Sequence, residues 1–228
     1  MPILHNSIIA AAADSTPADP VTRSLLKSAS TQKLSRTPSG GETKTWTMAL
    51  WVKKHTYGLT YQTIANAYNG SASNSMTFGF NSDEKLWFHS GGAVGEFCQG
   101  TTTRVFRDSS SWYHICLVLD ATLSTGTDRV KLWVNGEPET MVGMNGHNYY
   151  PSQNPTSLQW NGNWENTIFG TGNANNLSIA DFYFLDGHTV STPVGNFIES
   201  NNYGGYIPKA FDMSSYGGNS WHLDMQPA

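Results

Sequence analysis

The chain has 228 residues, a formal net charge of −4 and charged side chains at only 13% of its positions, whereas aromatic residues make up 12%. Low charge combined with ordinary hydrophobicity argues against a disordered chain, and the shortage of Lys, Arg and Glu argues against long amphipathic surface helices. The acidic balance leaves no basic surface for a phosphate backbone, and no segment approaches the roughly 18 consecutive apolar residues of a membrane span. We therefore expect neither a nucleic-acid partner nor a membrane partner.

Residues 1–33 are predicted to form an N-terminal arm, and residues 34–228 a single domain. The arm has a short apolar head, an alanine run and prolines at positions 17 and 20, without a lasting period of 2 or 3.6. It lacks the basic start of a secretory signal, so we expect no export by that route. The arm either packs on its own domain or is held by neighbouring subunits. In the second case its assembly contacts are the head residues Ile3, Leu4, Ile8 and Ile9.

From about residue 34 onward the sequence has the pattern of β-strands. Residues 46–54 alternate, which places Trp46, Met48, Leu50 and Val52 on one side of a strand. Residues 76–80 and 85–88 are two short apolar runs with the polar residues 81–84 between them, an arrangement that predicts a hairpin.

The middle of the chain adds a central strand and a second hairpin. Residues 112–119 are apolar on both faces, as expected of a central strand in a stacked pair of sheets; Cys116 lies there as a small core residue, and with Cys98 it could form at most one disulfide. Residues 128–134 alternate again, and the Asn135-Gly136 pair that follows favours a type I′ turn. Further strands are expected at 167–170, 179–185 and 221–225.

Two long segments, 143–166 and 187–219, have no strand or helix period and are predicted as loops. The first is polar and rich in Asn, Pro, Tyr and Trp, and a loop of this length in a compact domain is usually functional or packed by its own side chains. Many short strands without a convincing helix predict an all-β antiparallel sandwich or barrel.

Several segments resemble the phage LamG-like, concanavalin A-type sandwiches. Asp128-Arg-Val-Lys-Leu-Trp-Val-Asn-Gly136 is one of them, and all of them together extend over about residues 25–225 in the family's order. The others are 34–39 with 44–53, 111–115, 150–154, 179–187, 206–210 and 215–224. The resemblance implies a two-sheet antiparallel jelly-roll-like sandwich, with an extended arm before it and a loop-rich C-terminal segment. It also implies a structural protein of the bacteriophage virion.

Enzymatic activity is not expected, because the residue patterns that it needs are missing. Glycoside hydrolysis needs two carboxylates at a set separation, and the Glu-x-Asp-x-x-Glu signature of the hydrolases in this family is absent. The nearest acidic pairs are Asp83-Glu84, in a turn, and Glu137-Pro-Glu139. His114 and Cys116 are two residues apart on an expected core strand, which would bury the thiol rather than activate it.

Two kinds of ligand remain open. Many LamG-like modules hold calcium, and Asp120, Asp128, Asp181 and Asp186 lie near loops where ligands could converge; the alternative is ordinary turn capping, with no cofactor. A glycan could be recognised in the 143–166 loop, which offers aromatic side chains among asparagines; the alternative is a loop packed by its own aromatic residues. The candidate glycan contacts are Tyr149, Tyr150, Trp160 and Trp164.

The function expected from this reading is that of a non-enzymatic virion protein on the particle surface. As a capsid decoration or cement protein, it would bind the major capsid protein and copies of itself through its arms, with a trimer as one form of the oligomer. As a tail-fibre or receptor-binding module, it would instead recognise host surface glycans. The sequence leaves the choice between capsid and tail open.

Overall fold

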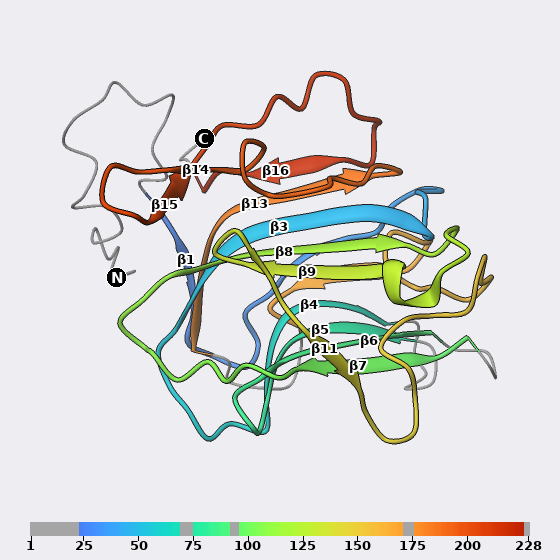
Figure 1. The fold of residues 1–228 in the computed structure, drawn as a ribbon, viewed down its shortest axis with the longest axis horizontal. Coiled ribbons are helices and arrows are strands. Elements are labelled where there is room, and N and C mark those ends of the chain that lie inside the picture. Colours follow the sequence, from blue (N-terminus) through green and yellow to red (C-terminus); the bar gives the residue numbers. More distant parts are fainter. Residues whose placement is uncertain (1–22, 69–74, 92–95, 171–175, 226–228) are drawn as a thin grey trace.

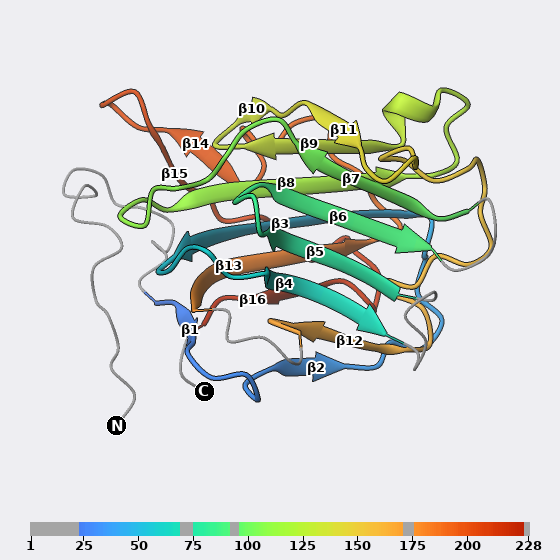
Figure 2. The same ribbon diagram turned by 90° about the horizontal axis from the view of Figure 1, so that it is seen from below.

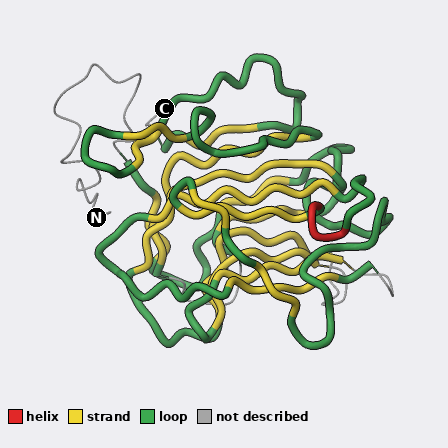
Figure 3. The backbone as a smooth tube through the Cα atoms, in the orientation of Figure 1, coloured by secondary structure: helices red, strands yellow, loops and turns green. Residues whose placement is uncertain are grey.

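The structure is a computed structural model that describes residues 23–68, 75–91, 96–170 and 176–225. It is an all-β sandwich of two antiparallel sheets stacked face to face (Figure 1), which confirms the predicted fold class. One short 3-10 turn, Gly126–Asp128, is the single helical element in the described part of the chain (Figure 3). No helix among these residues is long and apolar enough to cross a membrane.

The first sheet has β3 and β8 at its centre, and both β1 and β16 pair with β13. In spatial order its strands are β1 (Leu25–Lys27), β13 (Leu177–Asp186), β3 (Thr45–Lys54), β8 (Tyr113–Asp120), β9 (Val130–Val134) and β10 (Glu137–Pro138), with β16 (Trp221–Leu223) also on β13.

The second sheet lies below the first in Figure 1 and faces the viewer in Figure 2. In spatial order its strands are β11 (Met141–Gly143), β7 (Cys98–Thr102), β6 (Leu86–Gly91), β5 (Ser75–Asn81), β4 (Tyr61–Tyr68), β12 (Glu165–Ile168) and β2 (Leu34–Arg36). A separate pair, β14 (Ile198–Ser200) and β15 (Tyr206–Pro208), lies in the C-terminal segment.

The main core fills the space between the two sheets. The alternating β3 residues Trp46, Met48, Leu50 and Val52 all point into it, as predicted, and each is at most 1% exposed. Phenylalanines of β5 and β6 meet them from the other sheet, with Phe88 packing edge-on against Trp46 at 6.5 Å between ring centres. Complete burial of each such side chain stabilises the fold by about 1.5–3 kcal/mol.

A second apolar cluster covers the outer face of the first sheet. Cys116 and Tyr183 belong to it, and Phe211 and Tyr216 of the C-terminal segment pack against it. This cover explains why residues 112–119 are apolar on both faces: one face lies in the sandwich and the other lies under residues 190–216. Residues 187–219, predicted as a loop, therefore contain the β14–β15 hairpin and cover the outer face of the first sheet.

The local turn predictions are confirmed. β5 and β6 form the expected hairpin around residues 82–85, and β9 and β10 pair across Asn135 and Gly136, whose φ angles are 50° and 80°. Both cysteines, Cys98 and Cys116, are buried and free.

Other strands were not expected from the sequence. β1 lies inside the segment predicted as an arm, yet it pairs with β13, so residues 25–27 are part of the sheet. β4 is not evident from the sequence, because a bulge between Thr63 and Ala65 interrupts the alternation of inward and outward side chains.

Candidate functional site

The outer face of the second sheet carries a side-chain surface that the C-terminal segment does not cover. The outer face of the first sheet, by contrast, is packed under Phe211, Met213 and Tyr216. Figure 2 looks directly at the second sheet, in which β4, β5 and β6 run side by side. A shallow hollow of about 270 Å³ lies on this sheet. Its lining residues are Tyr61, Thr63, Asn66, Tyr68, Thr77, Trp87 and Gly170.

Strand register brings these residues together. Asn66 of β4 lies opposite Thr77 of β5, which lies opposite His89 of β6. One row along, Thr63 lies opposite Gly79, which lies opposite Trp87. Since side chains in register point to the same face of a sheet, the two rows form a continuous surface.

Aromatic rings stand at both ends of the hollow. Tyr61, 40% exposed, packs at 4.9 Å from the Trp87 ring, which is itself only 8% exposed. Trp87 is held in turn by an edge-on contact with His89 at 4.8 Å. Tyr68, at the far end of β4, is 49% exposed. Tyr61 is therefore an exposed ring on a fixed support, and Tyr68 is a second exposed ring.

Polar groups occupy the middle of the hollow. The Asn66 amide nitrogen donates to the Met76 carbonyl at 3.0 Å and to the Thr77 hydroxyl at 2.8 Å. These two bonds use both amide hydrogens and leave the Asn66 carbonyl oxygen as an acceptor. Thr77 still has its own hydroxyl hydrogen to donate.

His89 is uncharged at neutral pH. Burial lowers the pKa of its imidazole to about 4, and its Nε2 lies 2.9 Å from the Ser75 hydroxyl oxygen. The lining contains no Asp, Glu, Lys, Arg or His side chain, so the hollow is polar and carries no acidic or basic group.

Glycine is required at position 79, which lies in register between Thr63 and Trp87. A Cβ at this position would lie 2.2 Å from the Gln62 carbonyl oxygen, so no larger residue fits beside the β4 bulge. Exposed aromatic rings beside uncharged hydrogen-bonding groups suit a flat, hydroxyl-rich ligand. The apolar face of such a ligand can stack on the aromatic rings, and the hydroxyl groups at its edges can form hydrogen bonds with the polar side chains.

The predicted glycan contacts lie elsewhere and do not form one site. Tyr149 and Tyr150 pack edge-on against each other at 5.0 Å and are half-buried against the main core. They lie against Gly100 and Gly126, beyond β7 at one edge of the second sheet. The 143–166 loop is thus packed by its own aromatic residues at this point.

Trp160 is not available to a sugar, which corrects the prediction for this residue. It is 1% exposed and packs edge-on against Phe184 in the core at 5.8 Å. Trp164 is 43% exposed, but it adjoins β12, toward the opposite edge of the sheet from Tyr149 and Tyr150. Trp160 also lines a mostly apolar groove of about 330 Å³ between β2, β12 and β16, together with Leu34 and Trp221.

The predicted assembly contacts Ile3, Leu4, Ile8 and Ile9 lie outside the described residues. The four aspartates considered for calcium have separate partners. Asp181 pairs with His222 at 2.6 Å, and Asp186 accepts bonds from the Asn161 amide and the Glu42 backbone N–H. In residues 23–68, 75–91, 96–170 and 176–225, no three His, Cys, Asp or Glu side chains are grouped to hold a metal. Calcium stays a prediction.

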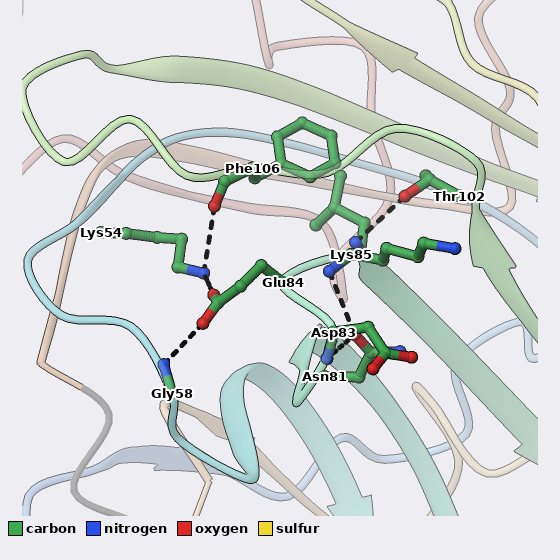
Figure 4. A network of polar contacts seen from close by, with 9 residues as sticks. Lys54, Gly58, Asn81, Asp83, Glu84, Lys85, Thr102 and Phe106 are labelled. Atoms are coloured by element: carbon green, nitrogen blue, oxygen red, sulfur yellow. Dashed lines mark hydrogen bonds and ion pairs between the residues drawn. The ribbon is translucent and has the colours of Figure 1, made fainter.

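Two of the four acidic residues noted in the sequence, Glu84 and Glu139, serve as ion-pair partners. Glu84, in the β5–β6 turn, pairs with Lys54, whose Nζ also donates to the Phe106 carbonyl at 3.3 Å (Figure 4). The other Glu84 oxygen accepts the Gly58 N–H at 2.6 Å. Glu139 pairs with Arg104 at 2.7 Å. Glu84 and Glu139 are thus each paired with a cation. A glycosidase site, by contrast, has two carboxyl groups that flank the bond to be cleaved.

The sequence contains one signal for the hollow, in the spacing of four residues of β4. Tyr61, Thr63, Asn66 and Tyr68 are the outward residues of β4, but the bulge shifts their spacing from two to three. Reading the strand with one inserted residue would have placed all four on one face.

The family comparison matches residues 28–181 to the concanavalin A-like lectin/glucanases superfamily. Among solved structures, a heptameric SAP-like pentraxin from Limulus polyphemus is similar, with a TM-score of 0.50 and 14% identity, over 87% of this chain and 91% of that one. Domains LG4-5 of the mouse laminin alpha1 chain have a TM-score of 0.47 and 10% identity, over 93% of this chain and 50% of that one. No curated protein matches the chain. At these identities the structural likeness concerns the fold alone.

Proposed function

The chain belongs to the concanavalin A-like lectin/glucanases superfamily, and we propose that it is a non-enzymatic glycan-recognition module of a bacteriophage virion. The family accounts for the fold, and the motif resemblance over residues 25–225 favours the virion. The binding surface proposed is the hollow on the second sheet.

One observation carries the glycan proposal. Exposed Tyr61, braced by Trp87, and exposed Tyr68 stand on either side of Asn66 and Thr77 on the sheet face that the C-terminal segment leaves uncovered. Stacking on a tyrosine stabilises the apolar face of a sugar ring, and the amide and hydroxyl groups bond its hydroxyls.

The ion pairs favour binding without hydrolysis. Retaining and inverting glycosidases both require two carboxyl groups flanking the scissile bond. No carboxylate lines the hollow, and Glu84 and Glu139 are each held by a cation at other places in the fold.

A glycan array with the full-length protein tests this proposal. We expect reproducible binding that is lost or weakened in Tyr61→Ala, because that substitution removes an exposed stacking ring. A single such ring contributes about 0.5–1.5 kcal/mol, or roughly 2- to 13-fold in affinity. Tyr203→Ala is the matched control, since Tyr203 is 82% exposed in the loop between β14 and β15, outside the hollow. Binding that persists in Tyr61→Ala and fails in Tyr203→Ala would contradict the proposal.

A second candidate role is capsid decoration. The apolar head of the arm favours it, because Ile3, Leu4, Ile8 and Ile9 would stabilise contacts with the major capsid protein or with further copies if covered. Copy number separates the roles: hundreds of copies per virion would favour decoration, and a handful at the tail would favour receptor binding.

A further inference from the structure

The hollow has a long axis that runs along β4. Tyr61 and Tyr68 are seven residues apart in this strand, and one residue lies in the bulge. With a strand rise of about 3.3 Å per residue, the two positions are about 20 Å apart. That span is several times the width of one sugar ring, so a single monosaccharide could not contact both tyrosines.

The residues between the two tyrosines are suited to the edges of a ligand rather than to its faces. Asn66 offers a carbonyl acceptor and Thr77 a hydroxyl donor, while Gly79, one row along, carries no side chain. The order along the axis is therefore ring, polar group, ring. This order matches a linear chain of pyranoses that lies flat on β4.

The charge around the hollow is balanced at both ends. At the Tyr68 end, Lys33 and Glu165 pair with each other at 2.7 Å. At the Tyr61 end, the turn after Asn81 contains Asp83, Glu84 and Lys85. Since Glu84 is paired with the buried Lys54, one acid and one base remain there. In the middle His89 is neutral, and an anionic sugar would lose hydration without gaining a free cation.

We infer that the hollow takes an extended, uncharged oligosaccharide along β4, with sugar rings stacked on Tyr61 and Tyr68 and hydroxyls bonded by Asn66 and Thr77. This inference rests on the proposed glycan-binding function. It adds that the ligand is uncharged and that it is longer than a single monosaccharide.

Binding measurements on the full-length protein test both the charge and the length of the ligand. A glycan array of neutral oligosaccharides, together with sialylated, sulfated and uronic-acid glycans, identifies the charge class. The neutral glycan with the strongest signal is then titrated as a series from disaccharide to hexasaccharide. We expect neutral glycans to bind, with affinity rising at least 5-fold from disaccharide to hexasaccharide and with little change between pH 6 and pH 8.

Variants at the two ends of the hollow locate the ligand. Tyr61→Ala and Tyr68→Ala should each weaken hexasaccharide binding about 3- to 10-fold, because each removes one of two stacking rings. For the disaccharide, only one of the two substitutions should have an effect, because a disaccharide covers one ring. Tyr61→Phe and Tyr68→Phe keep the rings and should retain binding, and Tyr203→Ala serves as the folded control.

The outcomes are distinguishable. Preference for anionic glycans, or affinity that does not depend on chain length, would overturn this inference while leaving glycan recognition intact. Absence of binding to every glycan on the array would overturn the proposed function itself, and the inference with it.

Discussion

At the scale of single residues, the buried Lys54–Glu84 ion pair is a contact whose loss should strongly destabilise the fold. Lys54 is fully buried, its Nζ lies 4.5 Å from the centre of the Phe80 ring, and burial lowers its pKa. The pair joins the end of β3 to the β5–β6 turn and, through Gly58 and Phe106, to two loops. An isolated charge in such a place is costly, so each partner depends on the other.

Removal of one partner is therefore expected to be more harmful than removal of both. Lys54→Met leaves Glu84 buried without its cation and should lower the free energy of unfolding by about 3–5 kcal/mol, as should Glu84→Leu. The double variant should be more stable than either single variant, which urea unfolding can measure. The exposed Lys33–Glu165 pair is the control, and Lys33→Met should cost no more than about 1 kcal/mol. Additive losses in the double variant would contradict this account.

The buried His114 and the partly buried His89 predict loss of stability in mild acid. Burial lowers the pKa of His89 to about 4 and that of His114 to about 3. Below the ordinary value near 6.5, the unfolded chain gains protons that the folded chain does not take up, so their contribution is complete above pH 6.5 and is lost as pH falls toward 4.

The free energy of unfolding should then decrease by up to about 1.4 kcal/mol per pH unit for each histidine. Urea unfolding between pH 7 and pH 4.5 gives this slope. His89→Gln keeps a polar group beside Ser75 but cannot titrate, so its slope should be about half that of the parent protein. An unchanged slope would show that His89 does not contribute.

At the scale of elements, the β9–β10 hairpin shows how a two-residue turn decides pairing. Gly136 has φ of +80°, and a Cβ at this position would lie 2.7 Å from the Tyr206 ring. The Asn135 side chain also accepts the His114 N–H at 2.7 Å, which ties the turn to β8. The turn thus connects β8, β9 and the C-terminal segment.

Gly136→Ala is expected to destabilise the protein by about 2 kcal/mol or more, because left-handed backbone costs a non-glycine residue about 1–2 kcal/mol and the methyl group meets Tyr206. Gly217→Ala is the matched control, since its Cβ would meet no atom within 4 Å. Thermal unfolding of the two variants gives the comparison, and equal midpoints would contradict the strain argued for Gly136.

At the scale of the whole molecule, the arm and the sandwich are expected to be separable. Among the residues that the structure describes, from 23 onward, the first paired strand is β1, which begins at Leu25, and the other strands of both sheets follow it. Deletion of residues 1–14 should therefore leave the unfolding midpoint within about 2 °C of the parent protein. If the head anchors the protein to a capsid, the same deletion should abolish attachment to purified particles. A truncated protein that still attaches would contradict the decoration role.

The sequence by itself determined the fold class, the residues that face the main core and the two tight hairpins. Each of these depends on local physical chemistry: alternation over a few residues decides the inward face of β3, and Asn135-Gly136 supplies the two positive φ angles of its turn. Trp46 and Val52 are predicted as core residues for this reason, and both are buried.

Only the tertiary structure decided which sheet face the C-terminal segment leaves uncovered and which of the described aromatic residues are exposed there. Trp160 and Tyr61 are both aromatic residues near polar neighbours in the sequence, yet one is 1% and the other 40% exposed. The difference arises because strand order and register place Asn66, Thr77 and His89 side by side, while the C-terminal segment covers the opposite sheet. Contacts between residues far apart in the chain depend on how the whole chain packs, and local patterns do not encode them.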